Sequence, residues 1–177
     1  MGPGILIASP QMKDPNFEET VVLLCQHDGD GALGVIVNRP TPFTIDDVIE
    51  QLDVEALKTQ EHQVLWGGPV ERGAGFVIFR GQVPEDSGWN LPGGVAVSPS
   101  REQLEKLIRS DSRYHLCLGY AGWGPGQLED EITTGSWLYT DVDLGLVLTG
   151  DVEERYESAL NALGLQRSMV WMKPVDE

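Results

Sequence analysis

The sequence predicts a single α+β domain in which helices pack outside a mixed, strongly curved β-sheet. Short apolar runs with β-branched residues, typical of strands, lie between turns rich in glycine and proline. Amphipathic helical patterns are mixed with these runs, without the steady strand–helix alternation that marks a parallel sheet. The chain has 177 residues, which suits one domain with a core large enough to need no staple. We therefore expect one domain over residues 1–177, without repeats or linkers.

The N-terminal part of the chain predicts a short strand followed by a β-hairpin. Ile5–Ala8 is a short apolar run. Thr20–Gln26 and Leu33–Val37 are strand-like, and the tight turn Asp28–Gly31 connects them. Gly29–Gly34 also spells G-x-G-x-x-G, but a dinucleotide site would need a helix next. The β-branched residues that follow favour the hairpin instead.

The middle of the chain predicts two capped helices and three short strands. Thr44 with Asp47 resembles a capping box, and Ser100 with Gln103 starts a second helix. Helical spacing gives each helix an apolar stripe, formed by Ile45, Val48, Ile49 and Leu52 in the first and by Leu104, Leu107 and Ile108 in the second. The expected strands are Val64–Trp66, Phe76–Phe79 and Val95–Ser98, with Val83–Gly93 as a loop.

The stretch Gly119–Glu131, GYAGWGPGQLEDE, carries the strongest concentration of special residues. The strand-like run Tyr114–Leu118 leads into it, and a short helical pattern, Gly126–Ile132, leads out. Glycines permit positive φ and close approach of other groups. We predict a functional loop here, because binding residues are concentrated on loops.

The last part of the chain predicts two strands and a helix. Trp137–Tyr139 and Leu144–Leu148 are expected to form a final pair of strands. Asp151 with Glu154 predicts a cap for the helix Val152–Leu163, and Gly164 suits the position after its end.

Charge and composition exclude several classes of protein. Twelve basic residues against 28 acidic ones give a net charge of −16, which repels nucleic acid phosphates, and no basic run offsets it. No apolar run approaches a membrane span, and the N-terminus MGPGILIASP lacks a basic leader. Two cysteines do not make a disulfide framework. We expect a cytoplasmic protein that binds neither nucleic acid nor membrane; its oligomeric state is not predicted.

Three motifs resemble the AlgH/YqgE family of bacterial proteins. They are the loop GYAGWGPGQLEDEI, the segment Gly67–Val70 (GGPV), and a front segment from Leu6 to Pro40 that includes His27 and Asn38–Arg39–Pro40. The similarity runs from Gly4 to about Gly164. The resemblance implies a sheet folded into a pseudo-barrel. It implies little about activity, beyond the label of putative transcriptional regulator.

The three motif loops, NRP, GGPV and GYAGWGPGQLE, are predicted to form one groove for a small ligand or a protein partner. No nucleophile elbow or phosphate-binding loop is present, so we expect a non-enzymatic binding or regulatory protein without a cofactor or catalytic residue. The candidate binding residues are His27, Asn38, Arg39, Gly67, Gly68, Pro69, Tyr120, Trp123, Gln127 and Glu129.

Each of these candidates has an alternative interpretation. Arg39 suits a carboxylate or phosphate of a ligand, or it pairs with an acid such as Glu129. Trp123 is either an exposed stacking platform or a core residue under the glycine-rich loop. A hydrolase would use His27 with Glu129 or Glu131 for acid–base chemistry. A DNA-binding regulator is disfavoured by the charge.

Two Cys/His pairs raise the question of a metal. Cys25-x-His27 and His115-x-Cys117 each place both side chains on one face of a strand. Four tetrahedral zinc ligands would converge if the two strands were neighbours. Buried cysteines that act as small apolar residues are the favoured interpretation, so no metal site is predicted.

Overall fold

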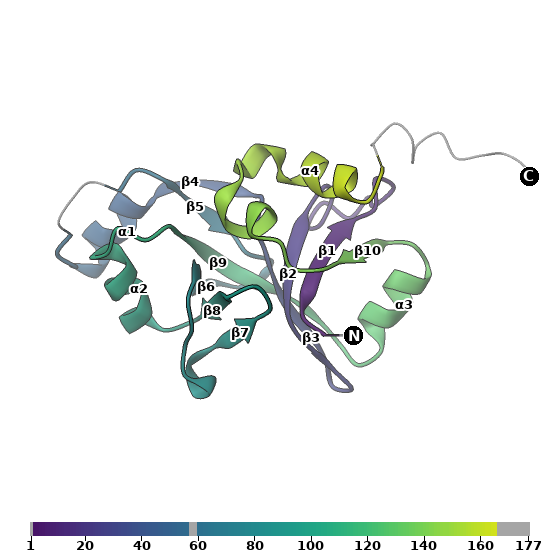
Figure 1. Ribbon diagram of the computed structural model, residues 1–177, viewed down its shortest axis with the longest axis horizontal. Coiled ribbons are helices and arrows are strands. Elements are labelled where there is room, and N and C mark those ends of the chain that lie inside the picture. The colour runs from purple at the N-terminus through teal and green to yellow at the C-terminus, as the bar shows by residue number, and fades with distance from the viewer. Residues whose placement is uncertain (1, 57–59, 166–177) are drawn as a thin grey trace, which may run out of the picture.

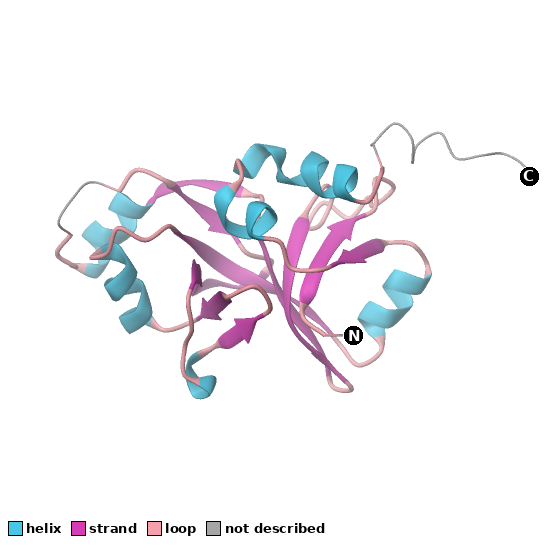
Figure 2. Cartoon of the chain, in the orientation of Figure 1, coloured by secondary structure: helices cyan, strands magenta, loops and turns pink. Residues whose placement is uncertain are grey.

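One sheet forms the frame of the protein. The computed structural model describes residues 2–56 and 60–165. Within them, ten strands form one open sheet in the order β10-β1-β2-β3-β9-β6-β8-β7, and the pair β4–β5 joins it at β9. All strand pairs are antiparallel except β5 with β9, so the sheet is mixed. Helices lie outside it (Figures 1 and 2), which confirms the predicted α+β class.

The elements have the following bounds. The strands are β1 (Gly4–Ala8), β2 (Val21–Asp28), β3 (Gly31–Ile36), β4 (Pro40–Thr44), β5 (Gln63–Trp66), β6 (Val70–Arg80), β7 (Trp89–Leu91), β8 (Val95–Ser98), β9 (Tyr114–Trp123) and β10 (Trp137–Thr140). The helices are α1 (Ile45–Leu52), α2 (Arg101–Ile108), α3 (Gln127–Thr133) and α4 (Arg155–Ala162). Short 3-10 turns span Glu85–Ser87 and Val152–Glu154, and a π-helical turn spans Gly145–Thr149.

The curvature of the sheet produces two hydrophobic cores. Side chains alternate between the faces of a strand, so Phe76 and Ile78 of β6 enter one core while Val77 and Phe79 enter the other. The inner core lies between β1–β3 and the facing side of β6 and β8. The outer core lies beneath α1 and α2, and includes Leu104, Leu107, Ile108 and Leu116.

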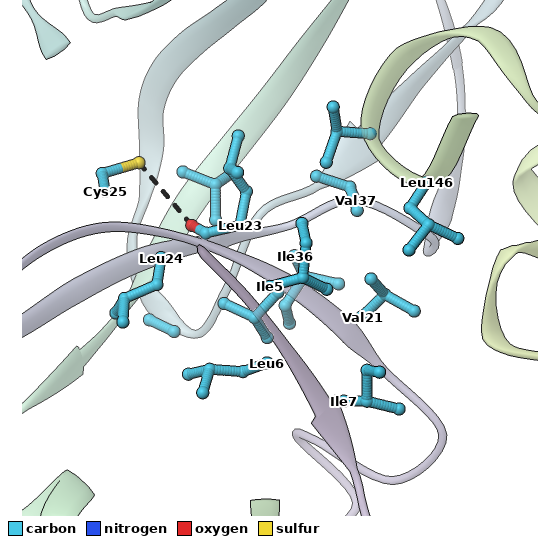
Figure 3. Packing of buried hydrophobic residues seen from close by; sticks show 14 of the residues in the cluster. Ile5, Leu6, Ile7, Val21, Leu23, Leu24, Cys25, Ile36, Val37 and Leu146 are labelled. Atoms are coloured by element: carbon cyan, nitrogen blue, oxygen red, sulfur yellow. Dashed lines mark hydrogen bonds between the residues drawn. The ribbon is translucent and has the colours of Figure 1, made fainter. Parts of the chain in front are cut away.

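The inner core contains the most completely buried strands. Every residue of β1 is buried, because neighbouring strands flank it and α4 contacts it, with Tyr156 donating to the carbonyl of Ala8 at 2.8 Å. Figure 3 shows the β1 side chains Ile5, Leu6 and Ile7 together with side chains of β2, of the end of β3 and the residue after it, and of the π-helical turn. These are Val21, Leu23, Leu24, Ile36, Val37 and Leu146.

Local sequence signals decide the hairpin and the two outer helices. β2 and β3 pair antiparallel from Val22–Ile36 to Asp28–Gly31, so G-x-G-x-x-G belongs to a hairpin, as predicted. Thr44 and Asp47 form a complete capping box on α1. Ser100 accepts from the backbone of Gln103 at the start of α2, which confirms the second predicted cap.

The strand β9 joins the two parts of the sheet. It runs from Tyr114 to Trp123, pairs with β5 and β6 through its first half, and pairs with β3 through Ala121–Trp123. The first part of the predicted functional loop is therefore strand, which corrects the prediction that the strand ends at Leu118. Partners on both sides supply the hydrogen bonds that hold this glycine-containing segment extended, despite its low strand propensity.

β9 bends at Gly119, where it meets bare backbone from the segment after β5. Gly119 has φ +79°, and a Cβ there would collide with the carbonyl oxygen of Gly68. A Cβ on Gly67 would likewise collide with the Gly119 carbonyl. Gly67 donates to Leu118 O at 2.6 Å and accepts from Ile36 N at 2.7 Å. This crossing, which we call the glycine crossing, thus links β3, β5 and β9 through close backbone contact.

The C-terminal part corrects two predictions. Leu144–Leu148 is not a strand; Gly145–Thr149 forms a π-helical turn, and β10 pairs with β1 instead. The predicted helix Val152–Leu163 begins as a 3-10 turn, and its α-helical part is Arg155–Ala162 without a side-chain cap. Gly164 follows the helix at φ +75°, as expected.

Three segments form strands where turns or loops are predicted. β4 begins at Pro40, where a strand stop is expected, and β7 lies inside the predicted loop Val83–Gly93. β6 begins at Val70, well before the predicted Phe76. β4 and β6 pair with strands that are distant in sequence and shifted in register, which local pattern does not reveal. β7 pairs with the adjacent β8, and that hairpin holds it extended.

The glycine crossing predicts a large stability loss for Gly119→Ala. The added methyl collides with backbone and stands at positive φ, so we expect the free energy of unfolding to fall by about 3 kcal/mol or more in urea titrations. Gly126→Ala is the matched control, because φ is +74° there but nothing lies within 4 Å of the added Cβ. It should cost about 1 kcal/mol. Equal losses would show that backbone conformation, not crowding, makes Gly119 necessary.

Candidate functional site

Three of the ten predicted binding residues come together at one small hollow. Arg39, Gly68 and Pro69 line a hollow of about 200 Å³, which we call the arginine hollow. Its other lining residues are Asn16, Ile36, Trp66 and Arg72. No residue of 119–131 is among the described residues that line it. The NRP and GGPV loops therefore meet at this hollow, whereas the GYAGWGPGQLE segment contacts the GGPV loop through backbone at the glycine crossing.

Asn38 and Arg39 hold the loop before β2 in place. The Arg39 guanidinium donates to two backbone carbonyls, from Nη1 to Asn16 at 2.7 Å and from Nη2 to Glu18 at 2.8 Å. The Asn38 side chain accepts from Val21 N at 2.9 Å and donates to Glu19 O at 2.9 Å. These contacts fix the direction of the Arg39 fork. They also show that it does not pair with Glu129.

Tyr120 lies next to the glycine crossing. Its ring packs edge-on against Phe76, with 5.9 Å between ring centroids. Its backbone pairs with Val70. Burial and the nearby carboxylate of Glu71 raise the pKa of the Tyr120 phenol. Gly67, Gly68 and Tyr120 thus contribute backbone to the glycine crossing.

Trp123 is a core residue, with 6% of its surface exposed. Its ring packs between Phe17, stacked at 6.2 Å, and Trp137, edge-on at 5.9 Å. The indole N–H groups of Trp123 and Trp137 both donate to Oε1 of Glu131 at 3.0 Å, and Gln127 donates to its Oε2 at 2.9 Å. The structure therefore supports the interpretation of Trp123 as a core residue over that of an exposed stacking platform. Glu131 and Gln127 anchor α3 over the inner core.

His27 and Glu129 form a pair that sequence pattern alone could not place together. His27 Nε2 lies 3.2 Å from Glu129 Oε2, with 7% of the histidine side chain and 48% of the carboxylate side chain exposed. A backbone hydrogen bond and the hydrogen bond from His27 lower the pKa of Glu129. The pair joins α3 to the hairpin of β2 and β3. Of the two acids proposed as partners for His27, Glu129 is the one in contact.

The two Cys/His pairs meet different partners. Cys25 and Cys117 are free and buried, and burial raises the pKa of both thiols, that of Cys117 to about 12. His115 Nε2 lies 2.9 Å from the guanidinium of Arg155, whereas His27 faces Glu129. Over residues 2–56 and 60–165, no three side chains of metal-ligating type gather in one place.

Arg155 is a buried cation that holds three segments together. Only 1% of it is exposed. It donates to Val37 O at 2.7 Å and to Gly150 O at 2.9 Å, which ties α4 to the end of the π-helical turn and to the chain after β3. Burial lowers the pKa of Arg155 to about 10. Burial and the Arg155 charge lower the pKa of His115 to about 3, so a neutral His115 accepts from Arg155 through Nε2.

A larger groove, which sequence analysis missed, lies on the outer side of the sheet between α1 and α2. Its volume is about 900 Å³. We call it the apolar groove, since its lining includes Phe43, Val48, Leu52, Val77, Leu104, Leu116 and Leu118. Arg72 lines both this groove and the arginine hollow, so the two are neighbours.

The sequence offered one signal for this groove. Phe43 is the one large hydrophobic side chain exposed among the described residues, at 45%. It lies outside the helical stripe of α1, next to Pro42, where neither strand nor helix pattern explains it. The other lining residues come from four distant segments, and only folding brings them together.

Comparison with known proteins gives a consistent match. The sequence pattern described as AlgH-like matches residues 5–168. A UPF0301 protein of Anaeromyxobacter dehalogenans is 41% identical, over 93% of this chain and 89% of that protein, and one of Myxococcus xanthus is 37% identical, over 97% and 96%. The solution structure of the AlgH protein from Pseudomonas aeruginosa superposes with a TM-score of 0.73 at 32% identity, covering 99% of this chain and 95% of that one.

A second solved structure supports the fold alone. A crystal structure of a protein from Corynebacterium diphtheriae has a TM-score of 0.69 at 22% identity, covering 92% of this chain and 87% of that one. Separately, every helix in the described residues is too short or too polar to cross a bilayer.

The contact between His115 and Arg155 predicts an acid-labile fold. The unfolded chain takes up a proton on this histidine near pH 6.5, whereas the folded protein resists it until about pH 3. Stability should therefore fall as pH drops through this window, by up to about 1.4 kcal/mol per pH unit from this group. In His115→Gln the urea-derived stability should fall less steeply with pH. Burial also lowers the pKa of His62, but less than that of His115, so His62→Gln should change the slope in the same direction by a smaller amount. Identical slopes in wild type and His115→Gln would contradict the assignment.

Proposed function

This chain belongs to the AlgH-like family, and we propose that it is a non-enzymatic, cytoplasmic binding protein of regulatory type whose ligand occupies the apolar groove. The size and lining of the groove carry this proposal. Binding sites for small molecules are concave, mostly apolar and about 300–1,000 Å³ in volume. The groove falls in this range and has mostly aliphatic side chains among its apolar lining residues. The NRP and GGPV loops line the neighbouring arginine hollow, which shares Arg72 with the groove, and Trp123 is outside the proposed site.

The walls of the groove are held in place before any ligand arrives. Both helices are capped at their first turns. Arg101 of α2 donates to the carbonyl of Leu52 at the end of α1 at 2.9 Å, and pairs with Glu105 at 3.0 Å. A preformed site loses little conformational entropy on binding, which favours affinity.

The serines of the lining and Asp47 are already engaged in hydrogen bonds, which favours binding over chemistry. Ser98 donates to Ser87 O at 2.6 Å, and Ser100 and Asp47 serve as helix caps. The described residues of the lining include no histidine or cysteine. A nucleophile paired with a base, as covalent catalysis requires, is thus missing from the described lining.

A hydrolase is the second candidate, and the 3.2 Å contact of His27 with Glu129 is the observation that favours it. A histidine beside a carboxylate is a common base and its orienting group. Glu131 is a weaker candidate, since its oxygens already accept three hydrogen bonds. A DNA-binding regulator is a poorer candidate, because the net charge of −16 opposes phosphate contact.

Screening against esters, phosphate esters and peptides separates the two candidates. We expect no turnover above background from the wild type. Hydrolysis that disappears in both His27→Ala and Glu129→Gln but persists in Asp130→Asn, a neighbouring exposed acid on α3, would establish the hydrolase instead.

The groove itself is tested with a neutral apolar fluorophore, N-phenyl-1-naphthylamine. Its fluorescence should rise on titration with wild-type protein. Val48→Glu places a carboxylate in the groove wall and should weaken binding tenfold or more, because the charge would lose its water on binding. Ser158→Glu puts the same group on the exposed side of α4 and should bind as wild type does. Equal affinity in all three proteins, or no binding by wild type, would refute the proposed site.

A further inference from the structure

From the junction of the two cavities we infer that the ligand is an amphipathic anion, whose apolar body fills the groove while its carboxylate or phosphate head contacts Arg72 beside the arginine hollow. This inference rests on the proposed function, because it names the chemical class of the ligand for the same groove. Arg72 carries it, as the residue that lines both cavities.

Arg72 has no acidic partner among the residues that the structure describes. Its side chain contacts the face of Trp66, where its Cζ lies 5.8 Å from the ring centroid. A guanidinium presents planar donors that match a carboxylate or phosphate in two-point contact.

The backbone around Arg72 places its side chain at the junction. The pairing of β6 with β9 shifts register between Val70 and Gly75, so the residues between them bulge from the ladder. Glu71 has φ +45° within this bulge. Gly73 and Gly75 follow Arg72 in the groove lining and add no side chains, which leaves the floor of the groove open beside the arginine.

Arg39 supplies a second guanidinium to the arginine hollow. It is fixed by the carbonyls of Asn16 and Glu18, both neutral groups. The carboxylates of Glu18 and Asp14 act on it as well, since they raise its pKa against the lowering effect of burial. Arg72 is therefore the principal contact for the head group, and Arg39 adds positive potential behind it.

The polarity of the groove agrees with such a ligand. The aliphatic residues Val48, Leu104 and Leu118 line the groove together with Arg72. Each methylene of a ligand buried there adds affinity, so a medium-length alkyl chain supplies the affinity and the head group the selectivity. Asp47 and Glu50, also in the lining, disfavour a second negative charge at the α1 border.

Three ligands with one chain length test the inference: decanoate, decyl phosphate and uncharged 1-decanol, each titrated by displacement of N-phenyl-1-naphthylamine. Wild type should bind at least one of the two acids tenfold or more tightly than the alcohol. The stronger of the two acids identifies the head group as carboxylate or phosphate. Arg72→Gln should abolish the preference while the alcohol binds as before.

The matched control is Arg80→Gln, which removes the same charge from the exposed far end of β6. It should keep the preference for acids. Equal affinity of wild type for acid and alcohol, or a preference that survives Arg72→Gln, would overturn the amphipathic anion while the groove stands. Absence of fluorophore binding by wild type would overturn the groove and this inference together.

Discussion

The close contact between the backbone of Gly67–Gly68 and the backbone of Gly119–Tyr120 is the constraint on which the rest of the structure depends. The glycines at 67, 68 and 119 allow this approach, because a Cβ added to any of them would collide with backbone atoms of the facing segment. Through it β9 changes partners, from β5 and β6 to β3. One strand thereby belongs to both halves of the sheet, and the sheet can curl around the inner core while its outer face remains available to α1 and α2.

The two faces of the sheet differ in what their charged groups contact. On the inner side, Glu131 accepts from two indoles and an amide, and Arg155 donates to carbonyls from separate segments. A buried charge such as Arg155 is stable only when hydrogen-bonded, and these contacts fix α3 and α4 in position. On the outer side, the helices leave a groove between them, with an arginine at its border that pairs with no acid in the described chain.

Local signals in particular residues predicted much of the fold. The Thr44 capping box, the Ser100 cap and the hairpin turn at Asp28–Gly31 each depend on neighbours in sequence, and the structure has them. Leu144–Leu148 has the composition of a strand, but Gly145–Thr149 forms a π-helical turn. The carbonyls of Val147 and of Gly150, just after the turn, accept from the buried Arg155 at the start of α4. Local signals said less about the candidate site. Trp123 and Arg39 were rightly chosen as unusual residues, but their hydrogen bonds serve the core and a loop.

The sequence by itself determined the α+β class, the caps, the central hairpin and the family, because each follows from residue types at short or characteristic spacing. Only the tertiary structure decided that GYAGW is strand, that His27 contacts Glu129, and that Phe43, Arg72, Leu104 and Leu118 border one groove. The physical reason is that a groove is a property of the space between elements. Its walls come from segments that are far apart in the chain, and their meeting is set by the packing of the curved sheet and by the backbone contact at Gly119.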